Sequence, residues 1–467
     1  MRTFSGPLLA AVSLLLLTTV DTLAEDTRFT ESVSTTAASL REAGLADTLA
    51  YELVESLTTE VGPRLAGTQA EARARDWAVA KLSALGFENV RVEPFTLPVW
   101  TRGIERAEIV SPFPQPLRIT ALGGSSSTGA AGVSGPVVRF DSLADLNRQP
   151  EGSLTGKIVF VDEVMTRTQD GSGYGVAVAK RRNTAYEAER LGAVGALIRS
   201  VGTSSHRFPH AGQMRRATET GAAGVPTAAL SAPDADQLGR ALARGNPVTV
   251  KLTLTPETRP AGKSGNVIAE IPGREAPGEI VLVGAHLDAW DLGTGAVDDG
   301  AGVGIVVAAA KLVQALRPRR TVRVVLFGSE EVGLVGAHDY ATRHAAELDR
   351  HIVAAESDFG ADRIWRFDTR FDESKRDLAQ AIAALLKPLG IGPGNNTARG
   401  GPDIGYLRNA GVPVVTLYQN GWDYFDLHHT PDDTLDKIDP AALAQNVAAY
   451  AAFIYIAAEM PGHFRAD

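Results

Sequence analysis

The sequence predicts an α/β protein with a mostly parallel central sheet flanked by helices, and with an inserted β-rich α/β domain. Two observations predict this fold class. From residue 264 onward, runs rich in Val, Ile and Leu alternate with stretches of helical apolar spacing, which is typical of strands buried on both faces of a parallel sheet. Between residues 112 and 259, short apolar runs are separated by loops rich in Gly and Ser, which indicates a separate unit.

Length and composition limit the number of domains, the partners and the kinds of site that this chain can have. Its 467 residues suggest two or three domains, and 44% hydrophobic residues suffice for a sizeable core. A net charge of −9, from 46 basic and 55 acidic side chains, predicts no nucleic-acid partner. The absence of cysteine excludes disulfides and thiolate sites, so any bound metal must use His, Asp and Glu.

The N-terminus is predicted to be a signal peptide over residues 1–24. Arg2 precedes an apolar run at residues 8–20, and a plausible small-residue cleavage site follows at 22–24. A membrane anchor is the alternative, but the apolar run is shorter than the roughly 20 residues of a spanning helix. We therefore expect a secreted or periplasmic chain without a stable membrane anchor.

The predicted elements divide into three parts. An N-terminal part of the main domain, residues 25–111, carries helical spacing at 33–60 and 68–85 and strands at 89–100 and 105–112. The inserted domain, residues 112–259, has predicted strands at 121–124, 135–140, 157–163, 195–200 and 247–257, a helix near 176–191 and a flexible loop at 123–135. The remaining part, residues 260–467, has predicted strands at 266–271, 279–288, 321–331, 351–358 and 413–419, and helices at 301–316, 335–347, 373–388 and 440–458.

Five polar blocks in the last part each lie where an apolar strand gives way to Gly-rich or polar sequence. In open α/β sheets, ligands bind at that edge. The blocks are AHLDAWD with His286 and Asp288, VDDGAG with Asp298 and Asp299, GSEEVG with Glu330 and Glu331, ESDFG with Asp358, and HHTPDDT with His428 and His429.

Each block alone has a structural explanation. Asp298 and Asp299 could cap the following helix, although two adjacent Asp exceed what a cap needs. One carboxylate can instead bridge two cations. We select Asp298 as the bridging ligand and expect Asp299 to shape the backbone. Glu330 and Glu331 could be a surface pair, yet at a buried strand end they repel unless a cation compensates. One Glu would then bind metal while the other takes a proton from the attacking water.

The first and last blocks complete the set. His286 and Asp288 are two residues apart and face the same side of the strand end, so the Asp288 carboxylate is expected to accept the second ring N–H of His286. Asp358 and His429, taken singly, suit structural roles. The other six His are expected to be surface or core residues, with His338 and His344 on a solvated helix face; they are His206, His210, His338, His344, His351 and His463.

Together the blocks supply one His and one acidic ligand to each of two metals, plus a shared Asp. Imidazole with carboxylate suits Zn²⁺ best, and Co²⁺ or Mn²⁺ are also compatible. Such a pair of cations hydrolyses amide bonds through a water that bridges the metals.

The five blocks resemble the co-catalytic di-zinc exopeptidase family of aminopeptidases and glutamate carboxypeptidases, and the likeness spans nearly the whole mature chain. The resemblance implies the zinc exopeptidase fold, with a protease-associated-like domain as the insertion. It also implies a cis bond between Asp298 and Asp299, with Asp298 as the bridging ligand and Glu330 as the general base. His286 and Asp358 would hold one zinc, and Glu331 and His429 the other.

The resemblance also selects His429 as ligand, because the family's ligand precedes Thr or Ser. His428 would lie near the substrate oxyanion and assist catalysis, with simple packing as the alternative. In the loop at 397–407, Asp403 could bind a free amino group and Arg399 a free carboxylate; both also suit a plain polar loop.

The expected function is hydrolysis of dipeptides or of N-terminal residues of small peptides, and relatives of this kind suggest a homodimer. Two alternatives remain. One is a non-catalytic, receptor-like binding protein on the same scaffold, and the other is a single-zinc enzyme of the glutaminyl-cyclase kind. The complete ligand set disfavours both.

Overall fold

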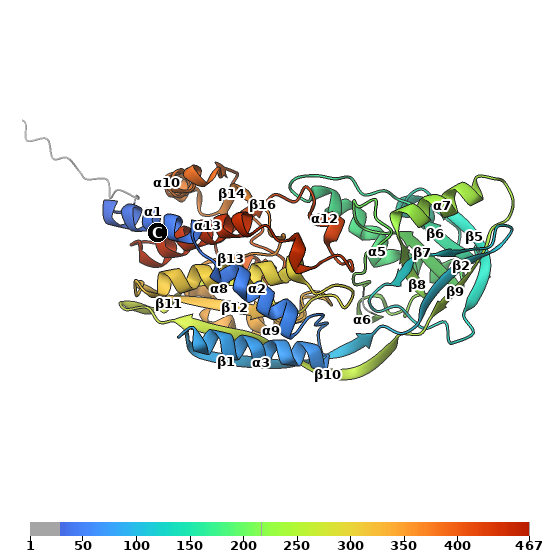
Figure 1. Ribbon diagram of the computed structural model, residues 1–467, viewed down its shortest axis with the longest axis horizontal. Coiled ribbons are helices and arrows are strands. Elements are labelled where there is room, and N and C mark those ends of the chain that lie inside the picture. The colour runs from blue at the N-terminus through green and yellow to red at the C-terminus, as the bar shows by residue number, and fades with distance from the viewer. Residues whose placement is uncertain (1–28, 216, 467) are drawn as a thin grey trace, which may run out of the picture.

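The computed structural model describes residues 29–215 and 217–466, so the predicted signal peptide lies outside the described residues. The chain forms two lobes, and each is built on an eight-stranded sheet (Figure 1). The first lobe contains both ends of the described chain, and the second is formed by its middle part.

The sheet of the first lobe has a parallel centre and antiparallel edges. Its strand order is β1-β10-β12-β11-β13-β16-β14-β15. The central strands β12, β11, β13 and β16 run parallel to one another. On one side β1 and β10 are antiparallel to their neighbours; on the other side β14 is antiparallel to β16 and parallel to β15. In chain order the strands are β1 (Glu88–Thr101), β10 (Glu257–Ile271), β11 (Ala276–His286), β12 (Arg320–Phe327), β13 (His351–Glu356), β14 (Ile364–Arg370), β15 (Gly392–Pro393) and β16 (Val414–Gln419).

Helices cover both faces of this sheet, which confirms the predicted fold class. One face packs against α1 (Glu31–Leu45), α2 (Leu49–Glu60), α3 (Gln69–Ala84), α8 (Ala301–Gln314), α10 (Arg376–Leu386) and α13 (Pro440–Glu459). The other face packs against α9 (Val335–Arg343) and α11 (Gly405–Asn409). Strands β12 and β13 are wholly buried, and β11 is buried from Ile280 to His286, as expected for apolar runs between two helix layers.

One predicted helix is divided in the structure, and another helix is apolar enough to resemble a membrane span. The single helical pattern at 33–60 is divided into α1 and α2, because the Asp47 side chain accepts from the Ala50 amide at 3.1 Å and starts a new helix. Helix α13 has the length and hydropathy to cross a membrane, but 94% of its most apolar window is buried in this protein. It is a core helix of the first lobe.

The second lobe has the strand order β3-β2-β9-β5-β6-β7-β8-β4. Its elements are β2 (Glu105–Ser111), β3 (Gln115–Leu117), β4 (Ile119–Ala121), β5 (Val133–Phe140), α4 (Leu143–Asn147), β6 (Ile158–Val161), α5 (Ser172–Arg190), β7 (Gly195–Arg199), α6 (Ala217–Thr220), β8 (Thr227–Leu230), α7 (Ala232–Leu242) and β9 (Thr249–Leu254). Strand β2 pairs with β9, so this sheet begins before the boundary predicted at residue 112. The long antiparallel pair β1 and β10 runs toward the second lobe (Figure 1).

The prediction for His344 is wrong. His338 is exposed, as expected, but His344 is buried at the end of α9. Its Nε2 lies 2.9 Å from a Glu93 carboxylate oxygen, and its Nδ1 bonds to Glu347. Two carboxylates from other elements give this histidine an ionic environment that no local helical pattern reveals.

Candidate metal centre

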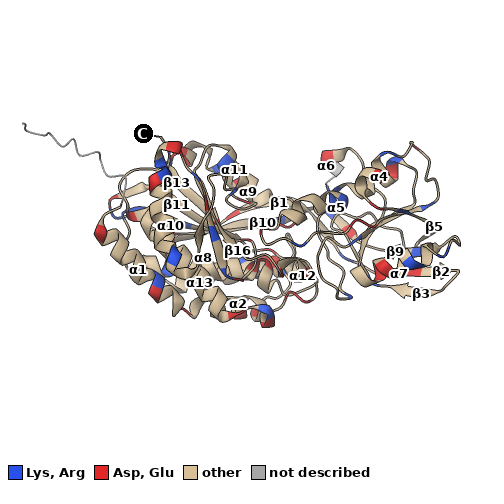
Figure 2. Ribbon diagram, turned by 90° about the horizontal axis from the view of Figure 1, so that it is seen from above, with Lys and Arg blue, Asp and Glu red and all other residues tan. Residues whose placement is uncertain are grey.

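The five predicted blocks meet at the carboxyl edge of the central parallel strands. His286 is the last residue of β11, the Glu pair follows β12, and Asp358 follows β13. The paired Asp lie in a kinked, non-helical turn within Ala296–Gly300, before α8, and the paired His follow α12 (Tyr424–Leu427). Figure 2 shows acidic residues gathered beside α12, on the side of the first lobe that faces the second.

Asp298 lies between two imidazoles. Its Oδ1 is 3.1 Å from His286 Nε2, and its Oδ2 is 3.2 Å from His429 Nε2. Each histidine also has its own acidic neighbour: His286 Nε2 is 3.3 Å from Asp358 Oδ1, and His429 Nε2 is 2.9 Å from Glu331 Oε2. The predicted ligands are thus arranged as two His–acid pairs joined by one carboxylate, and we call these five residues the metal cluster.

The metal cluster suits a bound cation. Three overlapping groups of potential ligand atoms each lie within 4.8 Å, namely Asp298 with His428 and His429, His286 with Asp298 and Glu331, and His286 with Asp299 and Asp358. Asp298 Oδ2 and Glu331 Oε1 are buried without a hydrogen-bond partner among the described residues. Buried carboxylates are costly unless a positive charge compensates, and the nitrogen and oxygen donors match zinc.

The Asp299 and Asp288 carboxylates both accept hydrogen bonds from backbone amides. Asp299 accepts from the backbone amides of His286 and Gly302, both at 3.0 Å, as expected for a residue that shapes the backbone. The bond from Asp298 to Asp299 is cis, also as expected. For Asp288 the expectation is wrong in detail: His286 Nδ1 contacts the Asp288 backbone carbonyl at 2.9 Å, while the nearest carboxylate oxygen is 3.9 Å away. The carboxylate instead accepts from the Glu330 amide at 3.0 Å.

The three residues predicted to take part in catalysis, Glu330, Asp288 and His428, lie beside the metal cluster. Burial raises the pKa of Glu330 well above its usual value, and the Asp358 and Glu331 carboxylates raise it further, against an opposing effect of His286. Burial likewise raises the pKa of Asp288 to about 7. His428 stacks on His429 with ring centroids 3.5 Å apart, and its Nε2 is 3.7 Å from Asp298 Oδ2.

The structure separates the two candidate substrate residues. Arg399 is exposed, whereas Asp403 is fully buried, and neither of its carboxylate oxygens has a hydrogen-bond partner among the described residues. Sequence reasoning missed its neighbour Glu356, the last residue of β13, whose Oε2 accepts from the Asp403 amide at 2.9 Å. The position of Glu356, two residues before Asp358 in the same block, is the signal that could have found it.

Sequence reasoning also missed two residues that hold the loop between His286 and Asp298. The guanidinium of Arg64 is fully buried and donates to the backbone carbonyls of Leu287, Thr294 and Gly295 at 2.6 to 2.8 Å. The Asp433 carboxylate accepts from the amides of residues 297 and 298 at 2.6 and 3.3 Å. Asp433 is visible in the HHTPDDT block, but nothing local marks Arg64, which is more than 200 residues from its partners.

The second lobe reaches the metal cluster through α5. Arg181 is buried, its Nη2 donates to the Tyr174 hydroxyl at 2.7 Å, and its Nη1 is 3.5 Å from His429 Nδ1. Its Nε has no hydrogen-bond partner among the described residues. Unlike Arg64, this buried cation therefore keeps an unused donor near the metal cluster.

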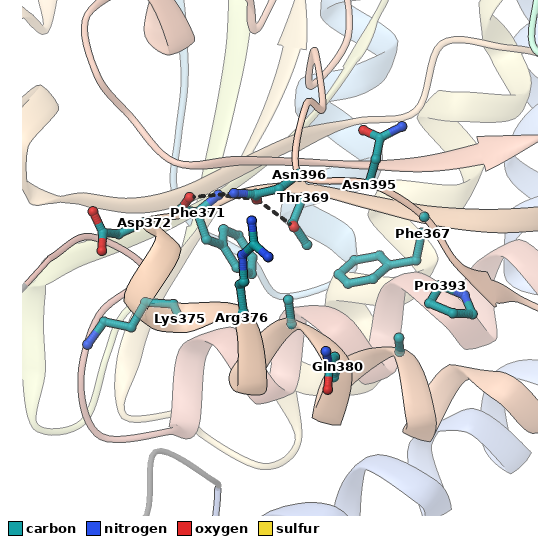
Figure 3. A pocket seen from close by; sticks show the side chains of 13 residues that line it. Phe367, Thr369, Phe371, Asp372, Lys375, Arg376, Gln380, Pro393, Asn395 and Asn396 are labelled. Atoms are coloured by element: carbon teal, nitrogen blue, oxygen red, sulfur yellow. Dashed lines mark hydrogen bonds between the residues drawn. The ribbon is translucent and has the colours of Figure 1, made fainter.

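A separate cavity of about 260 Å³ lies between β14, β15 and α10 (Figure 3). Phe367 and Phe371 form part of its lining, and the amide of Asn396 is bonded to Thr369 and Phe371. None of its lining residues belongs to the metal cluster. Its polar wall is thus engaged in bonds within the fold.

An α/β sheet with His, Asp and Glu at its carboxyl edge, arranged around one shared carboxylate, defines a metal-dependent hydrolase. The profile of Peptidase family M28 matches residues 266–454, which contain the whole metal cluster. The chain is also 34% identical over 420 residues to carboxypeptidase Q of Bos taurus, covering 89% of this chain and 87% of that protein. The chain belongs to peptidase family M28, and the predicted metallo-exopeptidase class is confirmed.

Solved structures agree with this assignment. The crystal structure of a peptidase M28 precursor from Shewanella amazonensis is 51% identical, with a TM-score of 0.91 over 93% of this chain and 98% of that one. A zinc aminopeptidase from Bacillus subtilis is 19% identical, with a TM-score of 0.65 over 88% of this chain and 95% of that one. The second likeness supports the fold alone.

Proposed function

We propose that this protein is a zinc-dependent exopeptidase that hydrolyses dipeptides or removes N-terminal residues from small peptides. The observation that carries the proposal is the Asp298 carboxylate, which has one oxygen toward each of two histidines that have separate acidic partners. This arrangement supports two metal positions rather than one. We further propose that residues 1–24 direct the chain out of the cytoplasm, and that it forms a homodimer.

The proposed roles follow the geometry. His286 and Asp358 would hold one zinc, Glu331 and His429 the other, and Asp298 both. Two bound zinc ions would polarise the scissile carbonyl and lower the pKa of a bridging water. Glu330 would accept the proton of that water and pass it to the leaving amine, because a carboxylate with a raised pKa beside the metal ligands is suited to both transfers.

Recognition of the substrate's free ends is proposed for residues at the margin of the metal cluster. Arg181 has a buried guanidinium with an unused N–H, which suits the carboxylate of a dipeptide. Asp403, beside Glu356, has unpaired carboxylate oxygens that suit a free amino group. The exposed position of Arg399 makes Arg181 the better candidate for the carboxylate. The cationic Arg181 and the acidic Asp403 together favour dipeptides whose amino and carboxyl ends are both free.

Metal removal combined with a substrate panel tests this function. We expect dipeptides to be hydrolysed, N-acetylated dipeptides and C-terminal amides to be hydrolysed more slowly, and a chelator to abolish all activity until Zn²⁺ is restored. Release of free amino acids from each peptide is the measurement. Activity that survives complete zinc removal would contradict the metallopeptidase assignment. Zinc-dependent binding of dipeptides without turnover would support the receptor-like alternative, and full activity with one zinc per chain would exclude the two-metal arrangement.

For His428 we propose a contact with the substrate oxyanion, because its ring lies against His429 and its Nε2 faces the Asp298 carboxylate. His428→Ala should lower kcat by about 10²-fold or more, as loss of one oxyanion donor does, while KM changes little. Steady-state kinetics on one dipeptide gives both values. A kcat within about threefold of the unsubstituted protein would leave His428 with packing alone.

A further inference from the structure

The segment that carries the paired histidines, residues 422–430, lies at the junction of the two lobes (Figure 1). Its one helical element, α12, is only four residues long. His429 itself has a positive φ of 61°, a conformation that costs energy for a residue with a side chain and persists only when the surroundings impose it. The backbone at His429 therefore needs restraining contacts, and these also limit the direction of its ring.

The second lobe supplies that restraint at the backbone. The Ala211 amide donates to the His429 carbonyl at 2.9 Å, and His210 Nδ1 lies 2.7 Å from the His428 carbonyl, which can only accept. The Ala211 carbonyl lies 3.3 Å from His429 Nδ1. When Nδ1–H donates to this carbonyl, Nε2 is left free to bind a metal, and the hydrogen bond fixes the plane of the ring.

A second set of cross-lobe bonds holds the segment just before the histidines. Arg167 donates to both carboxylate oxygens of Asp426 at 2.7 and 2.8 Å. The Thr203 hydroxyl donates to Asp426 at 2.8 Å, and the Thr203 amide donates to the Phe425 carbonyl at 3.0 Å. The Tyr174 ring stacks on Phe425 at 4.8 Å. These groups of the second lobe together contact α12 and both histidines.

The histidine of the other metal position is bonded within the first lobe. His286 ends a central strand, and its ring and amide are bonded to Asp288 and Asp299 of the first lobe. Asp358 directly follows the adjacent strand β13, which pairs with β11. One half of the metal cluster is thus held within the first sheet, whereas a ligand of the other half is held across the lobe junction.

We propose that the second lobe is a structural part of the metal centre: it positions His429, so that the contacts of Arg167, Thr203 and His210 set the affinity of the Glu331–His429 metal position. The His286–Asp358 position is independent of them. This inference rests on the two-zinc centre proposed above. Residues of the second lobe act here as positioning residues, since they contact the ligand segment and not the metal.

The test compares zinc affinity in variants of the full chain. Arg167→Met and His210→Phe, singly and together, remove the cross-lobe bonds of these two side chains while roughly keeping their size, and they leave the bonds of Thr203 and Ala211 in place. Arg207→Met is the matched control, because Arg207 also makes two bonds to one carboxylate, that of Asp234 inside the second lobe, through Nε and Nη2 at 2.8 and 2.7 Å. Competition with a chelator gives the dissociation constants of both zinc ions, and thermal unfolding of each zinc-free protein reports folding.

We expect the zinc at the Glu331–His429 position to lose about 10- to 100-fold in affinity in the double variant, the range found when partners of a metal ligand are removed. The other zinc and the control variant should be unchanged. The loss should persist in a His286→Ala background, which retains the Glu331–His429 position, and should vanish in a Glu331→Ala background. Thr203→Val provides a milder variant if the double variant does not fold.

Two results would overturn the inference. Zinc affinities within twofold of the unsubstituted protein would show that the junction only packs the lobes together, and equal weakening of both positions would show a general effect on the fold. Failure of the proposed function is distinguishable, because the unsubstituted protein itself would then bind fewer than two zinc ions.

Discussion

Glu330→Gln is expected to lower kcat by about 10²- to 10⁴-fold while both zinc ions remain bound. The amide has nearly the shape of the carboxylate but cannot accept a proton from water. Because Glu330 is placed beside the metal cluster and not within its ligand contacts, its loss should affect proton transfer and leave metal binding intact. KM should change little, since the proposed recognition of the substrate's ends uses other residues.

Steady-state kinetics together with zinc analysis of the same sample measures this effect. Glu330→Asp should recover part of the rate, because it restores a carboxylate at a longer distance. Retention of more than about a tenth of the activity in the Gln variant would show that another group is the base. The buried Asp288 carboxylate, with its pKa raised to about 7, would then be the next candidate.

Asp298→Asn is expected to weaken the binding of both zinc ions at once. The loss of affinity should be at least about 100-fold, the upper end of the range found when a hydrogen-bond partner of a metal ligand is removed. An amide has one carbonyl oxygen for metal binding, so it cannot place one oxygen toward His286 and another toward His429, as the carboxylate does here. Activity should fall below detection at zinc concentrations that saturate the unsubstituted protein.

Asp368→Asn is a suitable control, because Asp368 is equally buried on β14 of the same sheet but bonds to Asn395 and Arg366, away from the metal cluster. Equilibrium dialysis against zinc buffers measures both variants. If Asp298→Asn bound one zinc with unchanged affinity, Asp298 would be a ligand of a single metal. If it bound two, Asp298 would not be a ligand.

Much of the fold of the first lobe is predictable because its signals are local. The strands β11, β12 and β13 are continuous runs of Val, Ile and Leu ahead of polar blocks, and the structure has strands at those places. No strand is predicted at β14, because its sequence IWRFDTR lacks the continuous apolar run that marks the central strands. Strand β2 was assigned to the wrong side of a boundary because sheet membership depends on pairing with β9, far along the chain.

The family resemblance is needed to choose His429 over His428, but the amino-acid sequence alone predicts that the other polar blocks meet at one edge of a parallel sheet, because each comes after an apolar strand. The sequence also determined the donor chemistry, because a chain without cysteine offers only His, Asp and Glu. How these residues are held in place is visible only in the folded protein. Arg64 and Asp433 fix the loop before Asp298, and the second lobe fixes His429, through bonds between residues far apart in the chain. Such bonds leave no periodic pattern in the sequence, because they depend on where two separate folding units come together.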